Sequence, residues 1–348
     1  MKKLAFTATL CIAALSAAYS TFSMAAETPA AAPATAAAAR WTFDGGIHNN
    51  SLAISTDEGT AVVSYSERPD VVVYNLATGK VRAVLHGFVT PRNIVFAPSG
   101  KCFYVSDSSL GTVAKIDTAT LKTLSTVPAG AGAFGTTLSK DGGTLYINNQ
   151  AASTVTRYDL DHNEARAVIT GFAQPRQGVR LSPDGATLYV TNFLGDKITI
   201  VNTVTNKIDG EITGSNKLRA ISVTADGKTL FAANSGSNTI AVVDTDKRSI
   251  SSTIAVGKDP YGAALTPDGK FVYSGNLGDN TVSVISVATQ QVVATIAGFK
   301  EPRQAIVFSR DGSLAYVLNE DLSLSKVDLA SNWIVGTLAA PVLHAARS

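Results

Sequence analysis

Four arginines and two aromatic residues recur at one position of a repeated sequence, just before an apolar run. Along the chain this position holds Ser51, Arg92, Phe134, Arg176, Arg219, Tyr261 and Arg303. Arginine has a planar guanidinium that holds a carboxylate or phosphate through two parallel hydrogen bonds, and aromatic rings offer faces for stacking. This combination is typical of sites for a nucleotide, a single-stranded nucleic acid or a small acidic molecule.

Each of these arginines also has a structural alternative. It could pair with an acid such as Asp107, Glu320 or Asp321 and hold neighbouring repeats together. For one arginine the two interpretations stay open. Four like charges around one opening repel each other, so they require either an anion or compensating acids.

The repeat that positions these residues has a period of just over forty residues. Its marker is a turn glycine, found at Gly59, Gly100, Gly142, Gly185, Gly227, Gly269 and Gly312, with spacings of 41, 42, 43, 42, 42 and 43 residues. A period of this length indicates a solenoid or a propeller.

The content of each repeat decides between those architectures. The fourth repeat contains four short runs rich in β-branched residues, joined by turn residues such as Asp184-Gly185. Asp-Gly favours a type I′ hairpin turn, in which both central residues have positive φ. No repeat has ten residues with helical apolar spacing and helix caps. We therefore predict an all-β protein, a seven-bladed β-propeller with four antiparallel strands per blade.

The second run of six repeats ends in the same way. These runs are Phe103–Asp107, Leu145–Asn149, Leu188–Asn192, Leu230–Asn234, Val272–Asn276 and Ala315–Asn319. The pattern resembles the YVTN repeat of YncE-like periplasmic propellers, over about residues 46–340. The resemblance implies seven blades and an association with single-stranded DNA. Related propellers include lactonases and lyases, some of which use a metal. We expect the terminal Asn and Asp side chains to fix turns.

Nothing in the sequence indicates catalysis. The four histidines are His48, His86, His162 and His344, and of these His48 alone precedes an inner strand. One histidine without periodic carboxylates does not make a metal site. We therefore expect a non-enzymatic binding or scaffold protein without metal or cofactor. It would bind an anionic small molecule, single-stranded nucleic acid or a protein partner. The alternatives are a lactonase- or lyase-like enzyme using the same channel mouth, or a redox partner.

The N-terminal residues predict export. Lys2 and Lys3 precede an apolar run, and Ser23 and Ala25 fit a cleavage site after residue 25. We predict a signal peptide over 1–25, an Ala/Pro-rich linker over 26–40 and the propeller over 41–348. The protein would then be periplasmic or secreted, monomeric, and without a membrane span after cleavage.

Three further expectations follow from this organisation. Removal of two of the 29 Lys and Arg residues leaves 27, equal to the 27 Asp and Glu, so the mature chain is formally neutral. Trp41–Asp44 resembles a surplus rim strand, so either terminus could close the ring. Cys102, the cysteine left after cleavage, begins an apolar run and is expected to be buried and inert.

Overall fold

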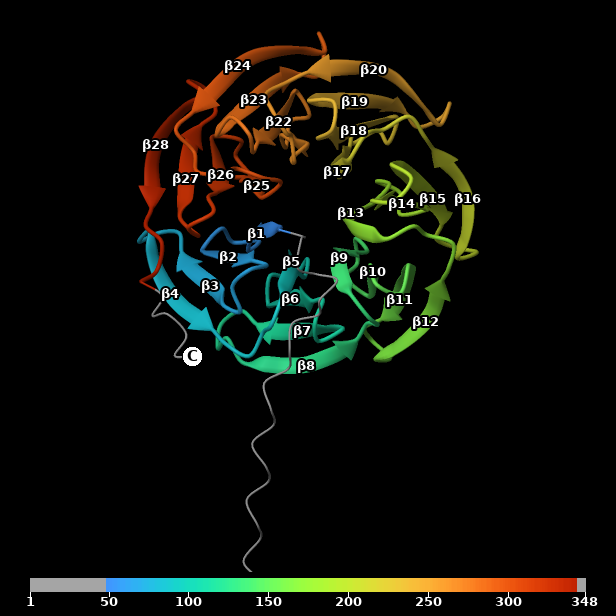
Figure 1. The fold of residues 1–348 in the computed structure, drawn as a ribbon. Coiled ribbons are helices and arrows are strands. Elements are labelled where there is room, and N and C mark those ends of the chain that lie inside the picture. The colour runs from blue at the N-terminus through green and yellow to red at the C-terminus, as the bar shows by residue number, and fades with distance from the viewer. Residues whose placement is uncertain (1–47, 343–348) are drawn as a thin grey trace, which may run out of the picture. The chain divides into compact units, whose positions relative to one another are not determined.

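The protein is all-β, as the repeat predicts. The structure, a computed structural model, describes residues 48–342; the predicted signal peptide, the linker and Trp41–Asp44 lie outside these residues. The described chain forms seven sheets of four antiparallel strands, arranged in a ring (Figure 1). Residues 48–342 contain no helix long and apolar enough to cross a membrane. The structure therefore confirms the seven-bladed β-propeller.

Each blade uses four consecutive strands, with the first strand innermost (Figure 1). Blade 1 contains β1 (Asn50–Ile54), β2 (Thr60–Tyr65), β3 (Val71–Asn75) and β4 (Lys80–Leu85). Blade 2 contains β5 (Pro91–Phe96), β6 (Cys102–Asp107), β7 (Thr112–Asp117) and β8 (Thr123–Pro128). Blade 3 contains β9 (Ala133–Leu138), β10 (Thr144–Asn149), β11 (Thr154–Asp159) and β12 (Glu164–Ile169).

The remaining blades repeat this order. Blade 4 contains β13 (Pro175–Leu181), β14 (Thr187–Asn192), β15 (Lys197–Asn202) and β16 (Lys207–Ile212). Blade 5 contains β17 (Leu218–Val223), β18 (Thr229–Asn234), β19 (Thr239–Asp244) and β20 (Ser249–Ala255). Blade 6 contains β21 (Ala264–Leu265), β22 (Phe271–Asn276), β23 (Thr281–Ser286) and β24 (Gln291–Ala297). Blade 7 contains β25 (Ile306–Phe308), β26 (Leu314–Leu318), β27 (Leu324–Asp328) and β28 (Trp333–Leu338).

Burial falls from the second strand of a blade to its rim. All six residues of β6 are buried, whereas β8, at the rim of the same blade, has one buried residue in six. The apolar side chains of adjacent blades pack against each other; Tyr189 and Ile198 of blade 4, for example, share a cluster with Leu218 and Leu230 of blade 5. Burial of these side chains on both faces of each sheet is the main stabilising contribution to the ring.

The Asp-Gly turn of the fourth repeat is not the type I′ turn that the sequence predicts. In the fourth repeat the amide of Gly185 donates to the carbonyl of Ser182 (2.8 Å), and Gly185 has a φ of +74°. Asp184 has no positive φ, so the turn is not type I′. Asp184 instead accepts hydrogen bonds from Ser182 Oγ (2.5 Å) and the amide of Ala186 (3.0 Å). The carboxylate satisfies backbone and side-chain donors within its own turn, and glycine takes the left-handed position alone.

Blades 1 and 7 close the ring through side chains. The hydroxyl of Tyr74 in β3 donates to the carbonyls of Leu322 (2.6 Å) and Ala339 (3.2 Å). The side-chain amide of Asn50 reaches the carbonyl of Leu318 (3.4 Å). Tyr74, Leu52 and Leu324 belong to one buried cluster that joins the two blades. Within residues 48–342 no strand of one terminal blade completes the sheet of the other.

Candidate functional site

The predicted arginines and aromatic residues meet at one end of the ring, which we call the channel mouth. This end carries the loops that enter the innermost strands and the loops that follow the second strands. The guanidinium carbon of Arg92 lies 4.6 Å from the ring centre of Phe134. Tyr261 is flanked by Arg219 at 4.4 Å and Arg303 at 5.1 Å. The structure therefore brings these predicted residues into contact with each other in pairs.

Phe193 is an aromatic residue of the mouth that sequence reasoning missed. It lies between the guanidinium carbons of Arg176 (3.3 Å) and Arg219 (5.7 Å). Arg176, Phe193, Arg219, Tyr261 and Arg303 thus alternate cation and ring around blades 4 to 7, and we call them the mouth stack. A signal was available, because Phe193 directly follows a second strand where the other blades have Ser66, Ser108, Gln150, Ser235, Leu277 and Glu320.

The predicted arginines and aromatic residues of the mouth differ in how deeply they are buried. Arg92 and Phe134 have no exposed surface, and Arg92 donates to Ser108 Oγ (2.8 Å) and Asn49 Oδ1 (2.9 Å). This leaves neither side chain any surface for ligand contact, contrary to their predicted place in a binding site. Arg303 and Tyr261 are 5% and 9% exposed, whereas Arg176 and Arg219 are half-buried. The accessible part of the mouth therefore centres on Arg176 and Arg219.

The loops of blades 4 to 7 share a backbone feature that directs the mouth residues. The residue before each Pro or Leu has a left-handed φ: Gln174, Lys217, Asp259 and Glu301, at +53°, +50°, +52° and +47°. The preceding blade anchors such a loop; the amide of Glu301 donates to Asn280 Oδ1 (2.8 Å) and that of Asp259 to Asn238 Oδ1 (2.9 Å). Non-glycine residues rarely adopt this conformation, so the surrounding hydrogen bonds hold it in place.

The acids near the mouth mostly bind other groups. Asp107 accepts from the amides of Val89 (2.7 Å) and Ser109 (3.0 Å), and Asp321 pairs with Lys300 (2.7 Å). This confirms that strand-end residues such as Asp107 fix the adjoining loops. Arg303 has a carboxylate partner, Glu301 (3.2 Å), so the structural alternative holds for this arginine.

Three other titratable groups lie on the same side of the ring. His48 Nδ1 is 2.8 Å from a carboxylate oxygen of Glu67, and both side chains are about 40% exposed. Tyr65 ends β2 and its ring centre lies 6.0 Å from the guanidinium carbon of Arg303. Burial raises the pKa of Tyr65 to about 12, so the phenol stays neutral near pH 7.

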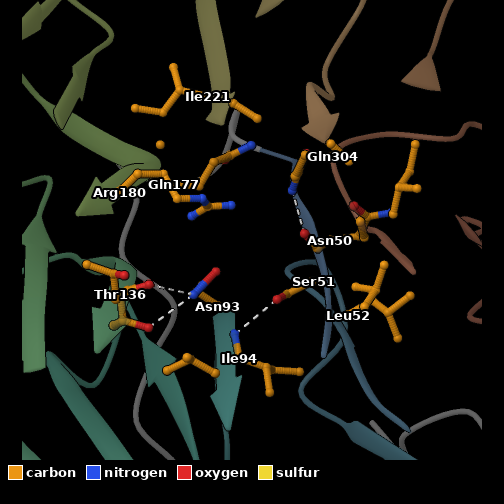
Figure 2. Close-up of a pocket in the computed structure, with 18 of the residues that line it drawn as sticks. Asn50, Ser51, Leu52, Asn93, Ile94, Thr136, Gln177, Arg180, Ile221 and Gln304 are labelled. Carbon is orange, nitrogen blue, oxygen red and sulfur yellow. Dashed lines mark hydrogen bonds between the residues drawn. The ribbon is translucent and has the colours of Figure 1, made fainter. Parts of the chain in front are cut away.

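A cavity of about 320 Å³ occupies the centre of the ring, lined by the innermost segments of all seven blades. Its one charged lining residue is Arg180 of β13 (Figure 2). Sequence reasoning missed this arginine, although its position relative to the turn glycine is informative. The other six repeats have uncharged residues there: Ile54, Val95, Thr137, Ser222, Ala264 and Val307.

Comparison with family models agrees with the propeller fold. A model described as a YNCE-like beta-propeller matches residues 169–340, and one described as a lactonase, 7-bladed beta-propeller, matches residues 70–207. Together the two matches support a YncE-like β-propeller family for this chain. Among solved structures, one from Kuenenia stuttgartiensis Hydrazine Synthase has a TM-score of 0.74 at 20% identity, covering 80% of this chain and 95% of that one. That likeness shows the fold alone. No curated protein sequence matches the chain.

Across residues 48–342 of this YncE-like propeller, no three His, Cys, Asp or Glu side chains gather in a group that could hold a metal ion. Cys102 is buried, which confirms the burial expected for this thiol. The arrangement with distinctive chemistry at the mouth is the row of guanidinium groups stacked on aromatic rings.

Proposed function

We propose that the protein is an exported binding protein whose channel mouth takes an anionic ligand through Arg176 and Arg219. The observation that carries this proposal is the mouth stack, in which Phe193 separates the two half-buried arginines and Tyr261 separates Arg219 from Arg303. A guanidinium stacked on a ring keeps its N–H edge available for hydrogen bonds in its own plane. The mouth thus presents fixed donors around an opening.

The stack reduces the entropic cost of binding. A free arginine side chain loses about 2 kcal/mol of rotamer entropy when it is fixed. Here the rings already restrict Arg176 and Arg219 before a ligand arrives, and Arg219 Nε also donates to Ser235 Oγ (2.9 Å). Arg219 has no carboxylate within 4.0 Å among the residues that the structure describes. Its charge is therefore available to a phosphate or carboxylate.

The burial of the aromatic rings favours ligand contact with the arginines over stacking on the rings. Tyr261 is 9% exposed and Phe134 is fully buried, and the protein's own arginines cover the rings. A ligand therefore contacts the guanidinium edges more than the ring faces. This favours recognition of phosphate or carboxylate groups, in a nucleotide, a single-stranded nucleic acid or a small acid, over stacking of bases.

The test compares two double variants that change net charge equally. Arg176→Ala with Arg219→Ala removes the half-buried pair, and Arg166→Ala with Arg248→Ala removes two arginines that are 44% exposed and paired to acids. Binding of a fluorescent oligothymidylate is measured by anisotropy over a range of salt. We expect the mouth variant to lose about 100-fold in affinity, with a salt slope smaller by about 1.4, because two phosphate contacts are removed.

The control variant should bind as the wild type does. Equal losses in both variants, or no loss in the mouth variant, would contradict the mouth site. Inorganic phosphate and adenosine monophosphate serve as smaller competitors. Competition by both would show that the mouth recognises an oxyanion rather than a chain of bases.

A second candidate rests on the lactonase model, which matches residues 70–207, and on the His48–Glu67 pair, 2.8 Å apart. An imidazole beside a carboxylate can act as a general base towards water. Under this candidate the protein hydrolyses a lactone at the same mouth. A pH-stat assay of the wild type with a set of lactones distinguishes it from simple binding, because only hydrolysis releases a proton continuously.

A further inference from the structure

The central cavity has one charged residue in its lining, Arg180. The lining residues come from all seven blades. Arg180 Nη1 donates to the carbonyl of Val179 on its own strand (2.8 Å). Within residues 48–342 no carboxylate lies within 4.0 Å of its guanidinium. Arg180 therefore lines the cavity without an acidic partner among these residues.

Arg180 is exposed, and its side chain opens into the cavity. Atoms of the surrounding ring partly desolvate the guanidinium and lower the pKa of Arg180 from its ordinary value. The ordinary pKa of arginine lies so far above 7 that the side chain stays protonated at neutral pH. Arg180 therefore remains a cation.

Three carboxamide side chains also line the cavity. Gln177, Gln304 and Asn50 come from blades 4, 7 and 1 and surround the space together with Arg180 (Figure 2). Gln177 and Gln304 are half-buried, whereas Asn50 is almost completely buried. The exposed parts of Gln177 and Gln304 therefore offer amide groups to a polar ligand in the cavity.

The cavity has an approach from the face opposite the mouth. Arg180 also lines two further hollows of about 410 and 640 Å³. The larger hollow is bordered by the Asp-Gly turns of blades 3 and 4. The carboxylates there, Asp141 and Asp184, already accept hydrogen bonds from Ser139 Oγ and Ser182 Oγ, each at 2.5 Å. Arg180 thus lines both the central cavity and the hollow beside it.

We propose that the central cavity binds a small hydroxylated monocarboxylate, with Arg180 holding the carboxylate and the half-buried Gln177 and Gln304 bonding the polar remainder. The guanidinium fork matches a carboxylate in two parallel hydrogen bonds. With a single cation in the lining, a monoanion leaves the filled cavity neutral, whereas a dianion leaves an excess negative charge. The proposal goes beyond the mouth site, because it uses none of the mouth residues.

The test uses L-lactate as the probe and lactamide, its neutral analogue, as the matched control. Saturation-transfer NMR and calorimetry give the affinity for the wild type, for Arg180→Gln and for the mouth variant Arg176→Ala with Arg219→Ala. We expect the mouth variant to keep the lactate binding that Arg180 provides, whereas any lactate held at the mouth is lost in that variant alone. Arg180→Gln should lose about tenfold or more, because a charge-assisted pair is removed. Lactamide should bind at least about tenfold more weakly than lactate to the wild type.

Each contrary result overturns the proposal. Lactate binding that survives Arg180→Gln but disappears in the mouth variant would assign the anion to the mouth. Absence of lactate binding in the wild type would remove the cavity site. Tighter Arg180-dependent binding of sulfate than of lactate would reject the monocarboxylate.

Folding of the variants is monitored independently. Arg180→Gln removes an unpaired charge, so its melting temperature should not fall below that of the wild type. Arg180→Lys keeps the charge without the planar fork and should retain part of the lactate affinity. If Arg180→Gln does not fold, loss of lactate affinity in a folded Arg180→Lys supports the proposal, and unchanged affinity in that variant overturns it.

Discussion

The two faces of the propeller differ in how far their side chains contact neighbouring blades. On the Asp-Gly face the turns are mostly self-contained: in six blades Ser or Thr donates to an Asp two residues later, which also accepts a backbone amide of the same turn. At the mouth, side chains from different blades contact one another. Phe193 of blade 4 stacks on Arg219 of blade 5, and Tyr261 of blade 6 lies beside Arg303 of blade 7.

This difference separates residues that maintain the repeat from residues that depart from it. A self-contained turn can be copied into every blade, because it needs nothing from its neighbours. Contacts between blades require particular partners, so they vary around the ring. Binding chemistry in a repeat protein is therefore expected where one blade departs from the others.

The largest expected effect is at a buried contact between blades. Arg92→Ala removes hydrogen bonds to Asn49 and Ser108 and the contact with Phe134, and it leaves a hole in a fully buried site. We expect a loss of about 3–4 kcal/mol in the free energy of unfolding, measured by urea denaturation. Lys270→Ala, on an exposed Asp-Gly turn, should have no measurable effect. Similar losses in both variants would contradict the distinction between the faces.

Two glycines give the next contrast. A Cβ on Gly275 would lie 2.2 Å from the carbonyl oxygen of Arg303, which belongs to the next blade. Gly269 lies in an Asp-Gly turn, has open space around it and has a φ of +70°. Gly275→Ala should cost about 3 kcal/mol because backbone must move, and Gly269→Ala about 1 kcal/mol through local strain alone. Thermal unfolding of the two variants measures the contrast, and the reverse order would refute it.

The smallest effect concerns protonation of an Asp-Gly turn. A hydrogen bond from Ser309 Oγ, with further bonds from Ser313, lowers the pKa of Asp311 to about 2, below its unfolded value of 3.8. The turn therefore contributes stability above about pH 4 and loses it as pH falls towards 2. Ser309→Ala should raise the pKa of Asp311 towards 3.8, as measured by carboxyl ¹³C NMR titration. Wild-type and variant stability should converge below about pH 2; an unchanged pKa would count against this account.

Periodic features were predictable from the sequence, and departures from them were not. Seven turn glycines and alternating strands were enough to predict the blades, and the strand-end Asp107 was rightly given a structural part. Arg92 and Arg219 occupy the same repeat position, yet one is fully buried and the other half-buried. Position in a repeat does not determine which side chains the neighbouring blades provide.

Residues missed from the sequence are of the same kind. Phe193 and Arg180 each occur in one blade, so a search for recurring positions passes over them. The conformation of the Asp-Gly turn was also mistaken, because the dipeptide alone does not reveal the hydrogen bond from Ser182 to Asp184. Comparison of the repeats position by position, with attention to the single exception, would have pointed to both residues.

The way the ring closes has a consequence for how the chain can be ordered. Every blade is a continuous stretch of sequence, and blades 1 and 7 meet through side chains such as Tyr74 rather than through a shared strand. The seam therefore resembles the other boundaries between blades. A circularly permuted chain that begins at β5 and ends at β4 would keep all seven sheets whole. The blades can therefore be synthesised in a different order and still form the same ring.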